Sequence, residues 1–340
     1  MIHKILEKSE KYKNVLIPNP LENLFISTTS VCNLKCAFCV HKKLSQQKTI
    51  MSKTDFESFI DKATDFGYES FNLTPNTGEP TIDPLFPDRL NFLERHNKVY
   101  DYYFSTNLTL ANDFFLKTLT DLKKLRCLSI SIYGHSAQSF TTITAGSLEL
   151  YRKIIDNLKL LLEYKTLTTK VELKIRTIQQ FDLNTCNSEL CSILKIARKQ
   201  GIRIRIKSQY SNWGGQITDR ELEQIGLKLK KKPHDRKEPC VFIFFNPALL
   251  TNGSINACAC ADGMANLVLG NLKNTNFRKI YSVHNNFYMK LLYRHLAGTF
   301  DGICQKCSEY RPISADWYAY AFHRKKMITV SKFIEWLSNT

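Results

Sequence analysis

Short apolar segments alternate with longer amphipathic segments along the first two thirds of the chain. The apolar segments have the length and residue types of strands and lie at residues 23–28, 70–75, 101–106, 128–133, 171–178 and 202–208. The segments between them have helical spacing and lie at residues 52–66, 84–96, 111–124, 147–164 and 186–200. This alternation predicts βα units around a parallel sheet. Six units are too few for a complete eight-stranded barrel, so we expect an α/β fold with a partial barrel over residues 23–215.

The pattern changes after the sixth predicted strand. Residues 216–238 are polar, basic and flanked by proline, which is typical of a linker. The segments CVFIFF (240–245) and INAC (255–258) flank turn-forming residues and predict a short hairpin within a region spanning 239–312. Aromatic residues at helical spacing predict a C-terminal helix over 313–340 whose aromatic stripe packs against the core; they are Trp317, Tyr320, Phe333 and Trp336. Residues 1–22 form an N-terminal extension.

The composition is that of a folded protein, with 43% hydrophobic residues among 340 and no apolar run long enough to cross a membrane. The N-terminus has no apolar signal core, so we expect a cytoplasmic protein. The net charge of +17 fits either a lysine-rich solvated surface or an anionic substrate or partner. In a reducing compartment, eleven cysteines favour metal ligands plus core thiols over disulfides. Cys127, Cys186 and Cys191 fall in strand-like or helix-like segments and are expected to be core residues.

Three cysteines crowd the loop after the first predicted strand. Cys32, Cys36 and Cys39 form a C-x3-C-x2-C motif. Three thiolates on one loop can hold three irons of a cubic iron–sulfur cluster and leave the fourth iron open to a small molecule. Zinc is the alternative, since it also binds thiolates and His41 could supply a fourth ligand.

The loop belongs to an ordered series of short motifs. CNLKCAFC, with Phe38 before its last cysteine, is followed by NTGEP (76–80), FSTN (104–107) and SISIYG (129–134), each at the end of a predicted strand. In this order the motifs resemble those of the radical S-adenosylmethionine (radical SAM) enzymes, although Thr77 stands where the family usually has a glycine. The resemblance implies a partial (β/α)6 TIM-like barrel and a 4Fe–4S cluster on Cys32, Cys36 and Cys39, with SAM bound to the cluster.

The resemblance also implies which residues contact SAM. Gly78 would give backbone access, Glu79 would meet the amino group, and Ser105, Asn107 and Ser131 would face the ribose and carboxylate. Phe38 belongs to the cluster loop. An electron donor such as flavodoxin or ferredoxin is the implied partner.

A second group of cysteines follows the predicted linker. Cys240, Cys258, Cys304 and Cys307 form C-x12-G-x4-C followed by C-x2-C, which resembles the auxiliary-cluster extension called SPASM in its shorter form, twitch. The resemblance implies a small hairpin-plus-helix domain holding an auxiliary 4Fe–4S cluster with four protein ligands. Such a closed cluster favours electron transfer over substrate binding. Cys260 is surplus and could be an alternative ligand, a hydrogen-atom donor or a buried core residue.

The last two strands of the predicted barrel alternate apolar and charged residues. Glu172, Lys174 and Arg176 share one face of residues 171–178, and Arg203, Arg205 and Lys207 share one face of residues 202–208. If that face points into the barrel, we expect the interior to bind a polar, anionic substrate, with Arg176 binding the carboxylate of SAM. The alternative is that both are edge strands with one wet face.

The implied function is that of a radical SAM oxidoreductase. We expect a sugar or cyclitol alcohol, in phosphorylated or nucleotide-linked form, to be oxidised to a ketone, with Asp262, Glu172 or Tyr133 as the base. One alternative is radical epimerisation with Cys260 returning a hydrogen atom. Another is modification of a peptide or protein side chain, which the short N-terminal extension disfavours. A zinc-stabilised nucleic-acid-binding protein would leave the ordered motifs unexplained.

Overall fold

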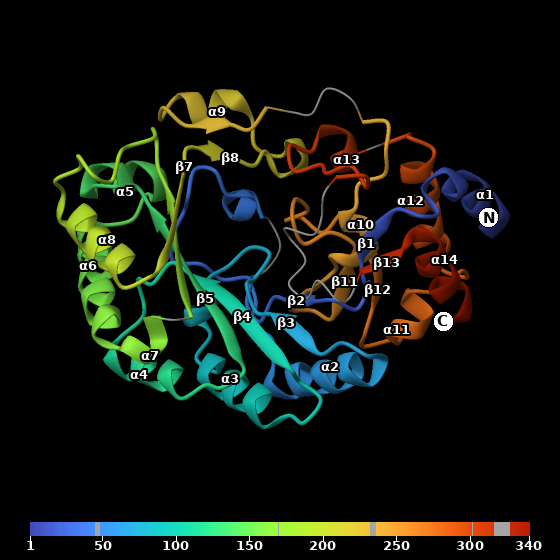
Figure 1. Cartoon of the computed structure of the whole chain (residues 1–340), viewed down its shortest axis with the longest axis horizontal. Helices are drawn as coiled ribbons and strands as arrows, with labels where there is room; N and C mark the ends of the chain where they lie inside the picture. Colours follow the sequence, from blue (N-terminus) through green and yellow to red (C-terminus); the bar gives the residue numbers. More distant parts are fainter. Residues whose placement is uncertain (45–47, 169, 232–235, 301, 316–326) are drawn as a thin grey trace.

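One continuous sheet organises the chain (Figure 1). The computed structural model describes residues 1–44, 48–168, 170–231, 236–300, 302–315 and 327–340. Within these residues the sheet has nine strands in the order β12-β11-β10-β2-β3-β4-β5-β6-β7. Their bounds are β2 (Leu24–Ile26), β3 (Ser70–Asn72), β4 (Asp101–Thr106), β5 (Leu125–Tyr133), β6 (Val171–Arg176), β7 (Arg203–Lys207), β10 (Ala248–Leu249), β11 (Ser254–Asn256) and β12 (Val268–Asn271).

Strands β2 to β7 lie in chain order and are all parallel, which confirms the predicted α/β partial barrel. Strand β6 shows why the sequence pattern located them. Its apolar residues Leu173 and Ile175 are buried, whereas Lys174 and Arg176 on the opposite face are only half-buried. Successive side chains of a strand point to opposite faces, so this alternation separates the face packed against helices from the polar face.

Helices follow the strands and cover the outer side of this sheet (Figure 1). Five of them match the predicted segments: α2 (Lys53–Phe66), α3 (Phe86–Arg95), α4 (Asp113–Thr120), α6 (Leu148–Glu163) and α8 (Glu189–Lys199). Two short helices were not predicted, α5 (Ala137–Thr144) and α7 (Lys165–Thr168). Helix α2 has both end signals, because Ser52 Oγ accepts the Asp55 N–H at 3.0 Å and Gly67 ends it with a φ of 113°.

The cysteine-rich region continues the same sheet. Strand β10 pairs parallel with β2, and β11 and β12 add antiparallel strands. The prediction that CVFIFF forms a hairpin strand is wrong, because α10 (Phe242–Phe245) is a short helix and the hairpin starts only at Ala248. A short apolar run carries no period that separates a strand from a buried helix. The region also holds α11 (Phe277–Ile280), α12 (Asn286–Leu296) and α13 (Gly302–Lys306).

The predicted linker contains regular structure in its described part. It includes α9 (Asp219–Glu223) and β9 (Lys228–Leu229), and β9 pairs with β8 (Gln209–Tyr210). Short 3-10 segments occur at Glu10–Tyr12, Val40–Lys43, Pro80–Ile82 and Trp213–Gly215.

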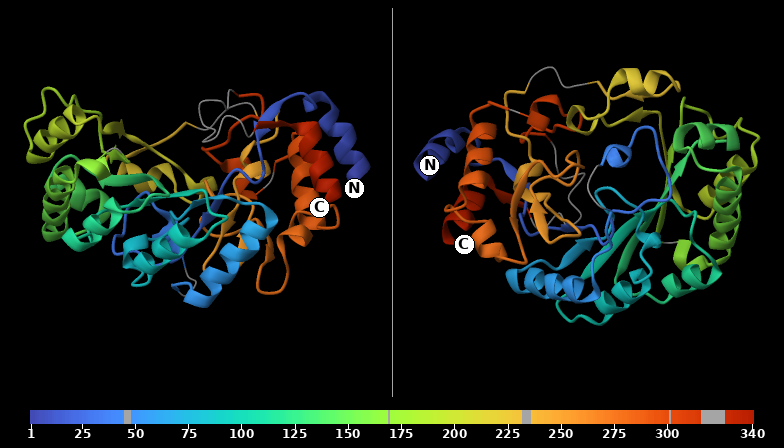
Figure 2. Two further views of the ribbon diagram at one scale, coloured as in Figure 1. Left: turned by 60° about the horizontal axis from the view of Figure 1, so that its bottom comes forward. Right: turned by 180° about the vertical axis from the view of Figure 1, so that it is seen from behind.

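The two ends of the chain pack together. Strand β1 (Leu16–Pro18) pairs with β13 (Met327–Thr329), and α1 (Ile2–Ser9) lies beside α12 and α14 (Val330–Asn339), at the end of the molecule away from α6 and α8 (Figures 1 and 2). The helix expected over 313–340 is therefore confined to α14 in the described residues, while Trp317 and Tyr320 lie outside them. Phe333 packs on Phe244 as expected, with ring centroids 5.0 Å apart. None of the helices described is long and apolar enough to span a bilayer.

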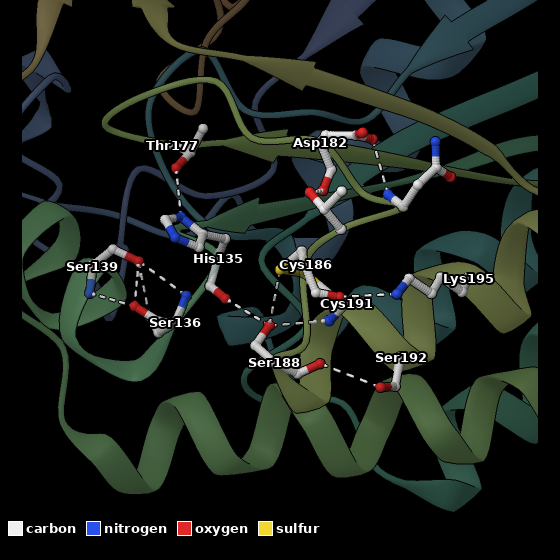
Figure 3. The surroundings of a disulfide bond; sticks show 12 residues. His135, Ser136, Ser139, Thr177, Asp182, Cys186, Ser188, Cys191, Ser192 and Lys195 are labelled. Atoms are coloured by element: carbon white, nitrogen blue, oxygen red, sulfur yellow. Dashed lines mark hydrogen bonds between the residues drawn. A yellow bond between two sulfur atoms is a disulfide. The ribbon is translucent and has the colours of Figure 1, made fainter.

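Cys186 and Cys191 form a disulfide, so the prediction that both are free core thiols is wrong (Figure 3). Ser188 caps α8 by accepting the Cys191 N–H at 3.2 Å. The chain turns at this cap, and the two Cα atoms lie 5.9 Å apart, within the range that a disulfide requires. Figure 3 also shows that the Ser188 hydroxyl donates to the His135 carbonyl, which ties the cap to the end of β5. Cys127, on β5, is a free thiol.

Candidate active site

A cavity of about 370 Å³ lies at the carboxyl ends of the parallel strands. Barrels of parallel strands commonly carry their functional residues at this end. The residues expected to contact the first cluster or SAM all line it: Cys32, Cys36, Phe38, Cys39, Gly78, Glu79, Ser105, Asn107, Ser131 and Arg176. The fold thus brings together four motifs that are widely separated in the sequence.

The three cysteines of the first motif sit on a loop that is anchored from several sides. The Lys35 and Ala37 N–H groups donate to carbonyls at the end of α5, at 2.9 and 2.8 Å. Trp213 Nε1 donates to the Phe38 carbonyl at 2.9 Å. These bonds fix the loop between the cavity and α5, so the thiols share one wall of the cavity.

The thiols have the character expected of ligands to an iron–sulfur cluster. Burial raises the pKa of Cys32 to about 12, and burial together with repulsion from Cys39 and Cys32 raises the pKa of Cys36. Three crowded buried thiols cannot all be thiolates without added positive charge, which cluster iron supplies. The donor set therefore fits a cluster with three protein ligands.

His41 lines the cavity beside these thiols, but in the described residues it is not grouped with them closely enough to complete a zinc site. Its Nε2 lies 3.0 Å from the Ser30 carbonyl oxygen, and the ring is buried. In the described ranges, no three His, Cys, Asp or Glu side chains are grouped closely enough to hold a single metal ion.

Glu79 is a buried carboxylate surrounded by hydrogen-bond donors. Thr81 and Thr106 donate their hydroxyls to Oε1 at 2.7 and 2.6 Å, and the Asn107 N–H donates to Oε2 at 2.8 Å. Burial raises the pKa of this carboxyl group. No cation in the described part of the chain forms an ion pair with it. A buried acid with donors but no cation, on a cavity wall, fits a ligand ammonium group such as that of SAM.

Gly78 lets the backbone approach the cluster loop. Its φ is 143°, and a Cβ at this position would lie 2.7 Å from the Thr29 carbonyl oxygen. The Glu79 N–H donates to the Val31 carbonyl at 2.8 Å, so the GEP turn lies directly against the segment that leads to Cys32. Only glycine fits both the conformation and the spacing.

Asn107 is held in a fixed orientation at the end of β4. Its Oδ1 accepts both the N–H and the hydroxyl of Thr109, at 3.0 and 2.6 Å, and its Nδ2 donates to Asn33 at 3.1 Å. Asn33 belongs to the cluster loop, so this network connects the loop to the strand end.

The charged face of β6 and β7 reaches the cavity only in part. Lys174, Arg176 and Lys207 line it, but Arg203 is exposed and is not part of the lining. Glu172 pairs with Lys174 at 2.6 Å and lies 3.8 Å from Arg205. The prediction of a cationic interior thus applies to the ends of the two strands, near the cavity.

The three residues considered as a base occupy different places. Tyr133 lines the cavity, with its ring 5.2 Å from that of Phe38. Glu172 does not line the cavity and forms ion pairs with Lys174 and Arg205 instead. Asp262 is fully buried and also outside the lining, because its carboxylate accepts the Asn266 side chain at 2.7 Å and the Leu267 N–H at 2.8 Å. The structure brings only Tyr133 to the candidate site.

A second, smaller cavity gathers the downstream cysteines. Cys240, Cys258, Cys304 and Cys307 all line it, together with Cys260. Burial raises the pKa of Cys240, Cys258 and Cys307 to about 12. The Arg236 guanidinium donates to the carbonyls of Cys304 and Cys307 and so braces the C-x2-C turn. Four largely buried thiols from three segments of the chain fit the ligand set of a closed cluster.

Cys260 and Glu309 line both cavities. Asn246 Nδ2 donates to Cys260 Sγ at 3.1 Å, and the Glu309 N–H donates to Cys307 Sγ at 3.2 Å. The two cysteine-lined spaces are therefore neighbours, separated by these side chains.

Sequence reasoning missed several lining residues, among them Trp213, Lys230 and Glu309. None belongs to a motif. The β8–β9 pair and the segment after α13 bring them to the cavity, so no local signal could have identified them.

The match to known families agrees with this geometry. Residues 26–173 match the Radical SAM superfamily. The probable GTP 3',8-cyclase of Saccharolobus islandicus strain M.14.25 is 27% identical over 221 residues, covering 64% of this chain and 62% of the relative. The GTP 3',8-cyclase of Clostridium perfringens strain SM101 is 25% identical over 225 residues, 64% of this chain and 65% of that protein. The aligned segment thus spans less than two thirds of either relative.

Solved structures share the fold over most of the chain. BtrN in complex with AdoMet and 2-DOIA has a TM-score of 0.58 at 14% identity and covers 88% of this chain and 98% of BtrN. Streptococcus suis SuiB bound to the precursor peptide SuiA has a TM-score of 0.57 at 16% identity, with 90% and 73% covered. At these identities the similarity establishes the fold alone.

Proposed function

We propose that this chain, which is a radical SAM enzyme, oxidises an alcohol of a polar, anionic substrate held in the larger cavity. A sugar or cyclitol alcohol would become a ketone. The observation that supports this proposal is the adjacency of the two cysteine-lined cavities, which share Cys260 and Glu309. A substrate in the larger cavity would lie next to an electron acceptor held by Cys240, Cys258, Cys304 and Cys307.

The residues described above define what each bound group would do. Cys32, Cys36 and Cys39 would hold the first cluster, and Glu79 with Arg176 would hold the ammonium and carboxylate of SAM. When bound, cluster and SAM supply one-electron cleavage of SAM and a 5′-deoxyadenosyl radical that removes a hydrogen atom from the substrate. The substrate alcohol would become a ketone by losing that hydrogen atom to the radical, one electron to the acceptor held by Cys240, Cys258, Cys304 and Cys307, and one proton to solvent.

The chain's own contribution is to orient the reactants and exclude water. The rings of Phe38, Tyr133 and Tyr210 pack together, with Phe38 5.2 Å from Tyr133 and 4.6 Å from Tyr210. Phe38 and Tyr133 line the cavity next to the cysteine loop, and the fully buried Tyr210 packs behind them. Burial raises the pKa of Tyr133 well above its ordinary value, so its hydroxyl stays protonated at neutral pH and would be able to donate a hydrogen bond to a substrate in the cavity.

The anionic character of the substrate rests on the cavity lining. Lys174, Arg176, Lys207 and Lys230 face two carboxylates, Glu79 and Glu309. The curated relatives are named for GTP, whose phosphates are also anionic, and this agrees with the charge of the lining.

Radical epimerisation is the second candidate, and the position of Cys260 favours it. A thiol that lines the larger cavity can return a hydrogen atom to a substrate radical, and Asn246 holds this one in place. In that reaction the substrate would regain a hydrogen atom and would not be oxidised.

The test is a single-turnover reaction of the anaerobically reconstituted chain with SAM, a reductant and candidate phosphorylated sugars. For an oxidase, Cys240→Ala should still form 5′-deoxyadenosine but should lose the ketone product, and Cys260→Ala should retain it. For an epimerase, Cys260→Ala should lose the epimer. If Cys240→Ala forms as much ketone as the parent, the auxiliary site is not the electron acceptor and the oxidation proposal fails.

A further inference from the structure

The end of β6 and the end of β7 present two cations side by side. Arg176 and Lys207 are register partners on adjacent parallel strands, and Arg176 is also the partner of Tyr133 on β5. Partners in register share one face of the sheet, and all three residues line the larger cavity. Like charges placed directly opposite each other destabilise a sheet. Arg176 is half-buried and Lys207 is exposed, so solvent or a bound anion offsets this repulsion.

A third cation reaches the same place from another element. Lys230 follows β9, and its N–H donates to the Tyr210 carbonyl at 2.8 Å, which fixes it beside the end of β8. Its Nζ contacts both oxygens of Glu309 at 2.5 and 2.7 Å. Burial and then the charges of Lys230, Arg176 and Arg205 lower the pKa of Lys207, while Glu309 acts in the opposite sense. Three cations of the cavity wall thus face one carboxylate.

The excess charge is not neutralised by neighbouring strands. The next row of the sheet is partly compensated, since Lys174 pairs with Glu172 at 2.6 Å and the same carboxylate lies 3.8 Å from Arg205, so that one carboxylate serves two cations. In contrast, neither Arg176 nor Lys207 forms an ion pair with any residue in the part of the chain described. If Arg176 takes the carboxylate of SAM, Lys207 remains without an anion.

We propose that Lys207 and Lys230, next to Arg176, form a subsite for a phosphate group of the substrate. This inference deepens the proposed function and rests on it, because the subsite is a wall of the same cavity. A phosphate offers three acceptor oxygens to donors that converge from different directions, whereas a carboxylate offers two. Lysine binds phosphate as a point charge, and the amide of Gln209, which also lines this wall, adds a neutral donor. The ion pair with Glu309 holds the Lys230 ammonium group in position, and a bound phosphate would accept a further hydrogen bond from the same ammonium group.

Calorimetry with inorganic pyrophosphate tests the subsite. The reconstituted holoenzyme is saturated with SAM, so that the carboxylate of SAM is already bound, and pyrophosphate is titrated under anaerobic conditions. Tricarballylate is titrated in parallel as a tricarboxylate of similar charge. We expect Lys207→Gln and Lys230→Gln to weaken pyrophosphate binding by roughly tenfold to a hundredfold each. The matched control is Lys228→Gln, since Lys228 is an exposed residue of β9 outside the lining, and it should bind as the parent does.

Each remaining outcome supports or overturns the subsite. Lys207→Arg keeps the charge and should retain binding within about threefold, which separates loss of charge from misfolding. Equal affinities for Lys207→Gln and Lys228→Gln would overturn the proposal, as would tricarballylate binding as tightly as pyrophosphate. The readout is independent of turnover. If pyrophosphate binds through Lys207 but SAM is not cleaved, the proposed function fails and the phosphate subsite stands.

Discussion

Replacing Glu79 by glutamine separates the stability of the chain from its affinity for SAM. The substitution keeps size and shape but removes the charge of a buried carboxylate that has donors around it and, among the described residues, no ion-pair partner. One accepting oxygen becomes an NH2 group. At Oε1 the Thr81 and Thr106 hydroxyls can rotate to accept it, and only the long 3.3 Å bond from the Thr81 N–H is lost. In the proposed binding mode SAM, in contrast, loses a charge-assisted hydrogen bond from its ammonium group, which contributes about 1.5–3 kcal/mol. We therefore expect SAM affinity to fall by roughly tenfold to a hundredfold.

The raised pKa of Glu79 sets the sign of the pH dependence. A carboxyl group whose pKa is higher in the folded than in the unfolded state contributes stability at low pH, and that contribution is lost as pH rises through the folded-state pKa. Without SAM, the parent should become less stable relative to Glu79→Gln as pH rises from about 4.5, the ordinary value, upward. SAM binding, which needs the carboxylate, should strengthen over the same interval in the parent and stay flat in the variant.

Equilibrium dialysis with labelled SAM and urea unfolding without SAM provide the two readouts. Glu163→Gln is the matched control, because Glu163 is an exposed residue of α6 far from the cavity lining. The reasoning is refuted if Glu79→Gln binds SAM as tightly as Glu163→Gln does, or if its loss of affinity is matched by unfolding in the absence of SAM.

Three further substitutions have defined outcomes. Gly78→Ala should destabilise the chain by about 1–3 kcal/mol in urea unfolding, since a residue with a Cβ would be strained at a φ of 143° and would clash with the Thr29 carbonyl oxygen. An unchanged unfolding midpoint would contradict the close approach of the Gly78 backbone to Thr29. Trp213→Phe removes the hydrogen bond to the Phe38 carbonyl and should lower the free energy of unfolding by about 1 kcal/mol. It should also loosen the cysteine loop, which is measured as faster loss of iron to a chelator. Iron loss at the parental rate would show that this hydrogen bond does not anchor the loop. The double variant Cys186→Ser with Cys191→Ser removes the crosslink that closes a short loop and should lower the free energy of unfolding by about 2 kcal/mol. SAM cleavage should be unchanged, because neither residue lines the larger cavity. If parent and variant were equally stable under oxidising conditions, the disulfide would not constrain the chain.

The sequence pattern predicted the barrel well because each strand of the barrel has one apolar face. Buried Leu173 and Ile175 alternate with Lys174 and Arg176, and this period of two survives in the structure. The candidate site was predictable where function demands fixed local spacing, as in the cysteine loop and the turn at Gly78 and Glu79. Both motifs line one cavity because the carboxyl ends of parallel strands lie at the same edge of the sheet.

Other features depend on contacts that a linear pattern does not contain. The helix at Phe242–Phe245 was predicted as a strand, because four apolar residues have no period. The link between Cys186 and Cys191 depends on the turn that Ser188 imposes at the start of α8. Trp213, Lys230 and Glu309 come to the cavity through long-range packing, and Asp262 is turned away from it by hydrogen bonds to its own neighbours.

The most direct test of the central claim is the formation of 5′-deoxyadenosine by the reconstituted chain. Under anaerobic conditions, with SAM and a strong reductant, the parent should contain about eight irons per chain, as two cubic clusters require, and should release 5′-deoxyadenosine. Cys36→Ala should retain the auxiliary cluster and release none. Equal release by parent and Cys36→Ala, or a parent that binds zinc without sulfide and leaves SAM intact, would contradict the account.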